Sequence, residues 1–168
     1  FAFITMLTSY LNPLIKVNLT YRNISPRYFA PEASTFSESS TIRNEKGFYL
    51  GMETFPHRKI KLNFYIDLYR FPWLRYNSVS PYHGRNILLK TEIIPTDKFN
   101  IGILFKSEYS FYRSKENNSG IQKMEKINLS RYMIQTNYEA SGQISLKSRI
   151  GLKTKTDNNT VRTGYFLS

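Results

Sequence analysis

Apolar and polar residues alternate strictly along residues 60–69 of the chain. One series is Ile60, Leu62, Phe64, Ile66 and Leu68, and the other is Lys61, Asn63, Tyr65, Asp67 and Tyr69. Successive side chains of a β-strand point to opposite faces of its sheet, so a period of two predicts a strand with one apolar face and one polar face. The aromatic residues that follow, from Phe71 onward, are expected to end this strand.

The same alternation recurs along the rest of the chain and predicts eight or nine strands. The expected ranges are 1–10, 14–24, 46–55, 59–71, 86–94, 98–112, 127–140, 143–155 and 160–168. β-Branched and aromatic residues dominate these ranges, and no apolar stripe of helical spacing extends beyond one turn. The sequence therefore predicts an all-β chain with a single domain over residues 1–168.

The connections between the expected strands alternate in length. Short connections are expected at residues 12–13, 56–58, 95–97 and 141–142, and long polar ones at 25–45, 72–85 and 113–126. In a meander this alternation puts the short turns at one end of the sheet and the long loops at the other. Short periplasmic turns and long external loops are typical of outer-membrane barrels. We therefore expect an antiparallel, up-and-down transmembrane β-barrel.

The apolar faces allow two interpretations. In a soluble β-barrel or sandwich they would form the core, whereas in a membrane barrel they would contact lipid and the charged faces would line the lumen. The expected strands are long, their aromatic residues gather near the ends, and their polar faces mix both signs of charge. These three features favour the membrane barrel.

This interpretation predicts two sets of site residues. The lumen-lining candidates are Lys16, Arg22, Glu53, Lys61, Asp67, Lys90, Glu92, Lys106, Glu108, Arg131, Glu139, Lys147, Arg149 and Lys153. The membrane-interface aromatics are Tyr10, Tyr21, Phe71, Trp73, Tyr76, Tyr109 and Phe111. Interfacial rings are expected at the headgroup level because they combine an apolar body with a polar edge.

Composition and charge indicate possible binding partners but no catalytic chemistry. The net charge is +12, which attracts polyanions such as nucleic acid, lipopolysaccharide or anionic lipid. A protein that binds nucleic acid by stacking needs its aromatic rings and its basic side chains on one face. Here the two kinds of residue fall mostly on opposite faces. A soluble, lipocalin-like barrel for an apolar ligand and a basic polyanion-binding module remain the alternatives. The absence of cysteine excludes disulfides and thiolate metal sites.

Residues 46–94 resemble barrel segments of Bacteroidota outer-membrane proteins that carry a helix-hairpin-helix region ahead of the barrel. The tract from Asp67 to Tyr76 (DLYRFPWLRY), a short polar loop and a Leu-rich strand carry this resemblance. It covers under a third of the chain, and the helix-hairpin-helix region is not in this sequence. The resemblance implies a Gram-negative outer-membrane location and a barrel topology, and it implies no chemistry.

No pattern in the chain predicts an enzyme or a cofactor. His57 is expected in a tight turn and His83 in a long loop, and neither has the convergent His, Cys or acidic neighbours of a metal site. Ser78, Ser80 and His83 share the expected loop 72–85, which does not set up a serine hydrolase. The loop at 25–45, rich in Ser, Thr and Glu, is expected at the surface as a contact for other envelope proteins.

The ends of the chain are expected to be cut. Phe1 opens inside a strand-like run, and the chain stops at GYFLS without a turn. We therefore expect a section of a larger barrel in the bacterial outer membrane. Its expected function is a pore, a transporter or a component of envelope assembly, with a polar and net basic lumen.

Overall fold

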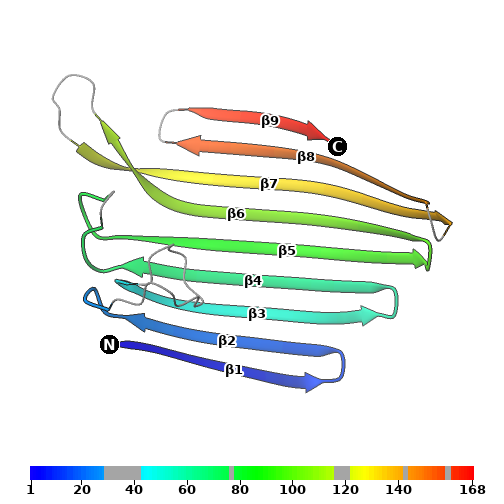
Figure 1. The fold of residues 1–168 in the computed structure, drawn as a ribbon, viewed down its shortest axis with the longest axis horizontal. Coiled ribbons are helices and arrows are strands. Elements are labelled where there is room, and N and C mark those ends of the chain that lie inside the picture. The colour runs from blue at the N-terminus through cyan, green and yellow to red at the C-terminus, as the bar shows by residue number, and fades with distance from the viewer. Residues whose placement is uncertain (29–42, 76–77, 116–121, 142–143, 158–159) are drawn as a thin grey trace.

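The computed structural model of the protein describes residues 1–28, 43–75, 78–115, 122–141, 144–157 and 160–168. Those residues form nine strands (Figure 1). The strands are β1 (Ala2–Asn12), β2 (Ile15–Ile24), β3 (Glu45–His57), β4 (Ile60–Phe71), β5 (Tyr82–Thr96), β6 (Phe99–Lys115), β7 (Gln122–Ser141), β8 (Ile144–Asp157) and β9 (Val161–Leu167).

The nine strands make a single antiparallel sheet in chain order, β1 to β9 (Figure 1). Each strand pairs with the next, and the register shifts only beside the turns that join β1 to β2, β3 to β4, β5 to β6 and β7 to β8. No described strand crosses over another. The all-β, up-and-down arrangement expected from the alternation is therefore confirmed. The sheet is open, because the edge strands β1 and β9 each have one partner within the described residues and do not contact one another.

The connections are sorted between the two ends of the sheet. Connections β1–β2, β3–β4, β5–β6 and β7–β8 lie at one end, which we call the turn end, and the others lie at the loop end (Figure 1). The connection between Asp157 and Val161 is short although it lies at the loop end, which departs from the expected pattern. It is closed locally, since Asp157 N donates to Thr160 O at 3.0 Å.

At the loop end, β5, β6 and β7 each extend three residues or more beyond their expected ranges. β5 starts at Tyr82 rather than at residue 86, so His83 lies in a strand and not in a loop. β6 and β7 continue past residues 112 and 127 and pair as far as Lys115 and Gln122. These strands extend further because their backbones pair with the neighbouring strand, even though apolar and polar side chains do not alternate clearly there.

The register assigns every strand residue to one of two faces. The row Arg22, Gly47, Tyr69 and Gly84 runs across β2 to β5 and belongs to the face that carries the charges, here called the polar face. The opposite face is here called the apolar face, and one of its rows is Leu50, Ile66, Ile87, Ser107 and Ser130. All the acidic residues of the described strands lie on the polar face: Glu45, Glu53, Asp67, Glu92, Glu108, Glu125, Glu139 and Asp157.

Burial is inverted between the two faces. The buried side chains of the strands all belong to the polar face: Thr20, Arg22, Ile24, Glu45, Asp67, Phe71 and Asn86. Large apolar side chains of the apolar face are exposed, including Leu89 on β5, Ile103 on β6 and Ile150 on β8. A water-soluble sheet would instead hide its apolar side chains and expose its charges.

Candidate functional site

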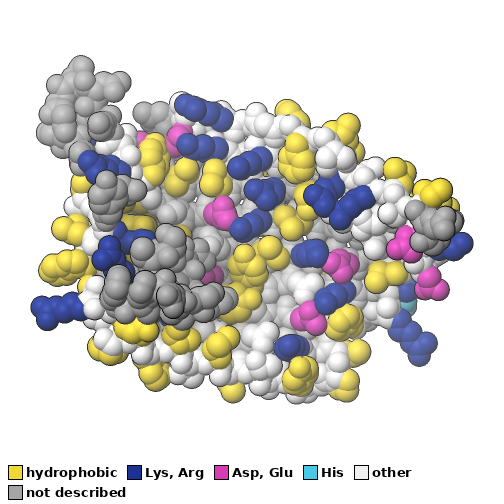
Figure 2. Space-filling model, viewed as in Figure 1, with side chains coloured by type: hydrophobic (Ala, Val, Ile, Leu, Met, Phe, Trp, Pro, Cys, Tyr) yellow, Lys and Arg dark blue, Asp and Glu magenta, His cyan; other side chains and the backbone are white. Residues whose placement is uncertain are grey.

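The polar face holds all of the predicted lumen-lining residues. Their rows follow from the pairing of Lys16 with Glu53, of Lys61 with Glu92, and of Lys106 with Arg131. Figure 2 shows Lys and Arg side chains spread over this side of the sheet, with Asp and Glu beside several of them. The face is not uniformly polar, since Leu88, Leu104 and Met133 also belong to it. The alternation therefore brings these residues together as expected.

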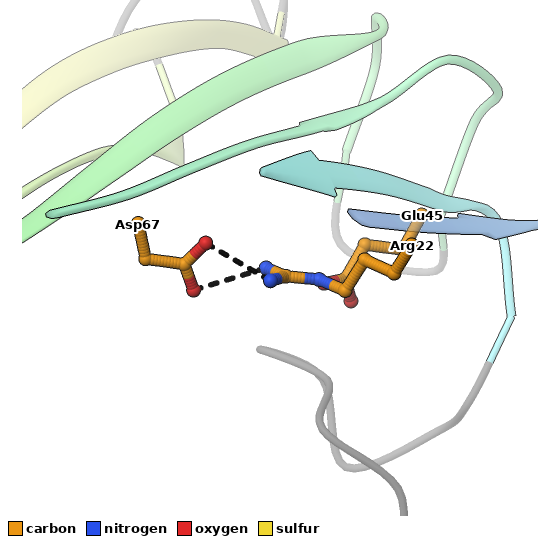
Figure 3. Close-up of polar contacts among 3 residues, drawn as sticks. All are labelled: Arg22, Glu45 and Asp67. Atoms are coloured by element: carbon orange, nitrogen blue, oxygen red, sulfur yellow. Dashed lines mark hydrogen bonds and ion pairs between the residues drawn. The ribbon is translucent and has the colours of Figure 1, made fainter. Parts of the chain in front are cut away.

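A buried ion cluster occupies the polar face near the loop end. Arg22 on β2 donates from both Nη atoms to the two carboxylate oxygens of Asp67 on β4, at 2.9 and 3.0 Å (Figure 3). Its Nε donates to Oε1 of Glu45 on β3. The side chains of Arg22 and Glu45 are 0 % exposed and that of Asp67 is 4 % exposed. One guanidinium thus joins three neighbouring strands through charge-assisted hydrogen bonds.

Gly47 makes room for this cluster. It pairs with Arg22 on one side and with Tyr69 on the other, in the middle of the row that the guanidinium crosses. A Cβ atom at position 47 would lie 2.5 Å from Cζ of Arg22. Only a residue without a side chain lets Arg22 reach across β3 to Asp67, which is why glycine is found inside this strand.

The loop end above the cluster is held by side-chain contacts with the backbone. Asn44, at a positive φ of 57°, pairs with the backbone of Trp73: Nδ2 donates to Trp73 O at 2.6 Å, and Trp73 N donates to Oδ1 at 2.9 Å. The hydroxyl of Ser78 accepts from Arg75 N at 2.8 Å. Asparagine is among the few residues that adopt a positive φ readily, so it suits this place. These bonds fix the chain where it leaves β4.

Further from the cluster, the charges of the polar face pair at partly exposed positions. Lys61 on β4 and Glu53 on β3 lie 2.9 Å apart, and Lys90 with Glu92 and Lys106 with Glu108 pair within single strands. Ion pairs with this exposure each contribute at most about 1 kcal/mol. These ion pairs therefore reduce the local net charge of the polar face and contribute little to the stability of the fold.

The part of the polar face over β7 and β8 remains basic. Within the described ranges, no carboxylate pairs with Arg131, Lys147, Arg149 or Lys153; Arg149 Nε instead donates to Gln135 Oε1 at 3.0 Å. This half of the face presents a surplus of positive charge.

The predicted interface aromatics divide into two groups. Tyr21, Tyr109 and Phe111 lie on the apolar face toward the loop end, and Trp73 follows β4 with 65 % of its surface exposed. Tyr10 and Phe71 belong to the polar face instead.

Phe71 in particular is placed differently from the expectation. It is 2 % exposed and packs against Tyr82 with ring centroids 4.9 Å apart, under the guanidinium of Arg75 at 4.2 Å. Its ring therefore packs inside the loop end and does not point outward with Tyr21. Tyr76 lies outside the described residues, as does most of the predicted contact loop 25–45.

The two histidines lie at opposite ends of the sheet. His57 ends β3 and accepts from Lys59 N at 3.2 Å, while His83 stands on the apolar face beside the Phe111 ring at 5.4 Å. In the part of the chain that the structure covers, no three His, Cys, Asp or Glu side chains are grouped as metal ligands. Nor does this part contain a helix of the length and apolar character needed to cross a membrane.

Comparison with protein-family models, with curated proteins and with solved structures finds no match for this chain.

Proposed function

We propose that the chain forms part of the wall of a transmembrane β-barrel in a bacterial outer membrane, with the apolar face in lipid and the polar face toward a water-filled interior. The inverted burial of the two faces carries this proposal. Arg22, Glu45 and Asp67 are enclosed on one side, while Leu89 and Ile103 are exposed on the other. Such an arrangement is stable only where the exposed side meets an apolar medium.

The height of the apolar face supports the same orientation. On β4 it runs without a charge from Ile60 to Leu68 and then meets Arg70. About nine residues of a tilted strand match the apolar band of a membrane barrel, which is roughly 25 Å tall. The exposed rings of Tyr21 and Trp73 lie toward the loop end, where interfacial aromatics would meet the headgroups.

The open edges of the sheet are consistent with a section of a larger barrel. In a bilayer the outward N–H and C=O groups of β1 and β9 must be paired, because no water reaches them. Further strands of the wall would supply this pairing, since β1 and β9 run in the same direction and could pair with one another only in parallel. In this proposal the nine described strands are one part of the closed wall.

The surplus of positive charge over β7 and β8 suggests what passes or binds inside. With Lys147, Arg149 and Lys153 on the interior side, the lumen would favour anions, as rings of charge do in other pores. A pore or transporter for anionic solutes is therefore our proposal for the activity. A barrel with the same wall could instead act as a component of envelope assembly.

The membrane part of this proposal is tested by the behaviour of the purified protein. We expect the chain to stay monodisperse only in detergent or vesicles, measured by light scattering and sedimentation as detergent is removed. A stable, detergent-free monomer would contradict the proposal and would favour a soluble barrel that encloses an apolar ligand.

The pore part is tested by planar-bilayer recording under a salt gradient. We expect currents whose reversal potential shows a preference for chloride over potassium. The double variant Arg149→Glu and Lys153→Glu should shift that potential toward the potassium value, while His57→Gln at the turn end should leave it unchanged. The absence of current from correctly inserted protein would favour the role in envelope assembly.

A further inference from the structure

The few charges on the apolar face are all of one sign and all at one end. Every acidic residue of the described strands lies on the polar face, so the apolar face has none there. Its basic residues with described side chains are Lys46, Arg70, Arg85, Arg113 and Lys126. Each stands in the part of its strand nearest the loop end. We call Lys46, Arg70 and Arg85, with His83, the basic rim.

The basic rim is compact because its strands are adjacent. Lys46 on β3 pairs in register with Arg70 on β4, and Arg70 pairs with His83 on β5. Arg85 stands in the next row toward the turn end, opposite Leu68. Three strands therefore present four basic side chains within two rows of one face.

A hollow of about 650 Å³ lies among these residues. Lys46, Arg70, His83 and Arg85 line it together with apolar and aromatic side chains, namely Tyr21, Phe48, Leu68 and Tyr109. The guanidinium of Arg85 lies over the Tyr109 ring, 5.7 Å from its centroid. The hollow thus has a basic edge and an apolar floor. The floor is formed by the side chains of Tyr21, Phe48, Leu68 and Tyr109 and continues into the rest of the apolar face.

The charges of the rim have no opposite partner in the described part of the chain. Lys46 and Arg70 stand directly opposite one another, an arrangement of like charges that destabilises a pair of strands. No described carboxylate forms an ion pair with Lys46, Arg70 or Arg85. A bound anion would remove this repulsion.

We infer that the basic rim binds the phosphate headgroup of an anionic lipid, whose acyl chains lie on the apolar floor below it. A small anion would use the cations alone, whereas a phosphorylated lipid uses both the cations and the adjoining apolar surface. Arginine is suited to phosphate because its planar fork donates two hydrogen bonds at once. This inference rests on the proposed orientation of the apolar face toward lipid, and it assigns the anionic lipid to the leaflet at the loop end.

The test uses the full chain in neutral maltoside micelles, with bound lipid counted by native mass spectrometry. Phosphatidylglycerol or a monophosphorylated lipid A is titrated in one series and phosphatidylcholine in another. The triple variant Lys46→Gln, Arg70→Gln and Arg85→Gln should bind the anionic lipids about tenfold or more weakly. A matched triple variant, Arg58→Gln, Lys59→Gln and Lys98→Gln, removes the same charge from exposed positions at the turn end and should bind them as the unaltered chain does.

Three results would overturn the lipid site. Equal loss of binding in both triple variants would mean that net charge alone attracts the lipid. Equal binding of phosphatidylcholine and phosphatidylglycerol would mean that the site does not distinguish lipids by the charge of the headgroup. Full competition by inorganic phosphate at the lipid concentration would identify a free phosphate site instead. None of these results changes whether the chain requires detergent, so failure of the site and failure of the membrane proposal can be told apart.

Discussion

Replacing Phe64 with arginine lowers the free energy of unfolding by about 2–4 kcal/mol in a lipid environment, whereas replacing its neighbour Asn63 with arginine changes it by less than about 1 kcal/mol. Phe64 lies on the apolar face between Met52 and Leu89, near the middle of the uncharged run of β4. A guanidinium there has to leave water for hydrocarbon. Asn63 faces the polar side between Glu53 and Lys90, where a new cation has a carboxylate beside it.

The two variants are compared by urea unfolding in vesicles, followed by tryptophan fluorescence and by protease accessibility. The two substitutions introduce the same residue one position apart in the same strand, so the distance from the turn is nearly matched. Equal losses of stability would contradict the assignment of the two faces. A larger loss for Asn63→Arg would show that the faces are reversed.

Replacing Arg22 with methionine lowers the free energy of unfolding by about 3–5 kcal/mol, because it leaves two buried carboxylates without their cation. Glu45 and Asp67 are almost fully enclosed, so neither can regain its hydration where it stands. Lys61→Met breaks the partly exposed pair with Glu53 and should cost less than about 1 kcal/mol.

A variant of the whole cluster separates the cost of an unpaired charge from the loss of packing. Arg22→Met combined with Glu45→Gln and Asp67→Asn removes all three charges, and most of the lost stability should return. Urea unfolding of the single and triple variants measures this difference. A triple variant that is as unstable as Arg22→Met alone would show that the cluster acts through shape and not through charge balance.

The sequence predicted the two faces of the sheet well, because a period of two requires only that a strand be continuous. Once Ile60–Phe71 is a strand, Asp67 and Leu68 must point to opposite sides. The strand ends were harder to predict. Segments such as Tyr82–Arg85 mix polar, aromatic and glycine residues, so pairing with β4 and not alternation decides that β5 begins there.

The ion cluster could not be predicted from alternation. The sequence places Glu45 in the expected loop 25–45, whereas its contact with Arg22 depends on the register of β2 with β3 and on the small size of Gly47. The sequence signal for the cluster is that Arg22 and Asp67 are charged residues of one face with Gly47 between them. Phe71 was misplaced for a related reason, since an aromatic residue at a strand end can pack inward as easily as outward.

The central claim is that the apolar face contacts lipid, and fluorescence quenching by brominated lipids tests it most directly. Trp73 is the single tryptophan of the chain, so Trp73→Phe provides a background without intrinsic signal. Ile103→Trp and Leu104→Trp then place one ring at a time on the apolar and polar faces of β6. In vesicles of lipid brominated at mid-chain, we expect strong quenching at position 103 and little at position 104. Equal quenching at the two positions, or stronger quenching at position 104, would contradict the account.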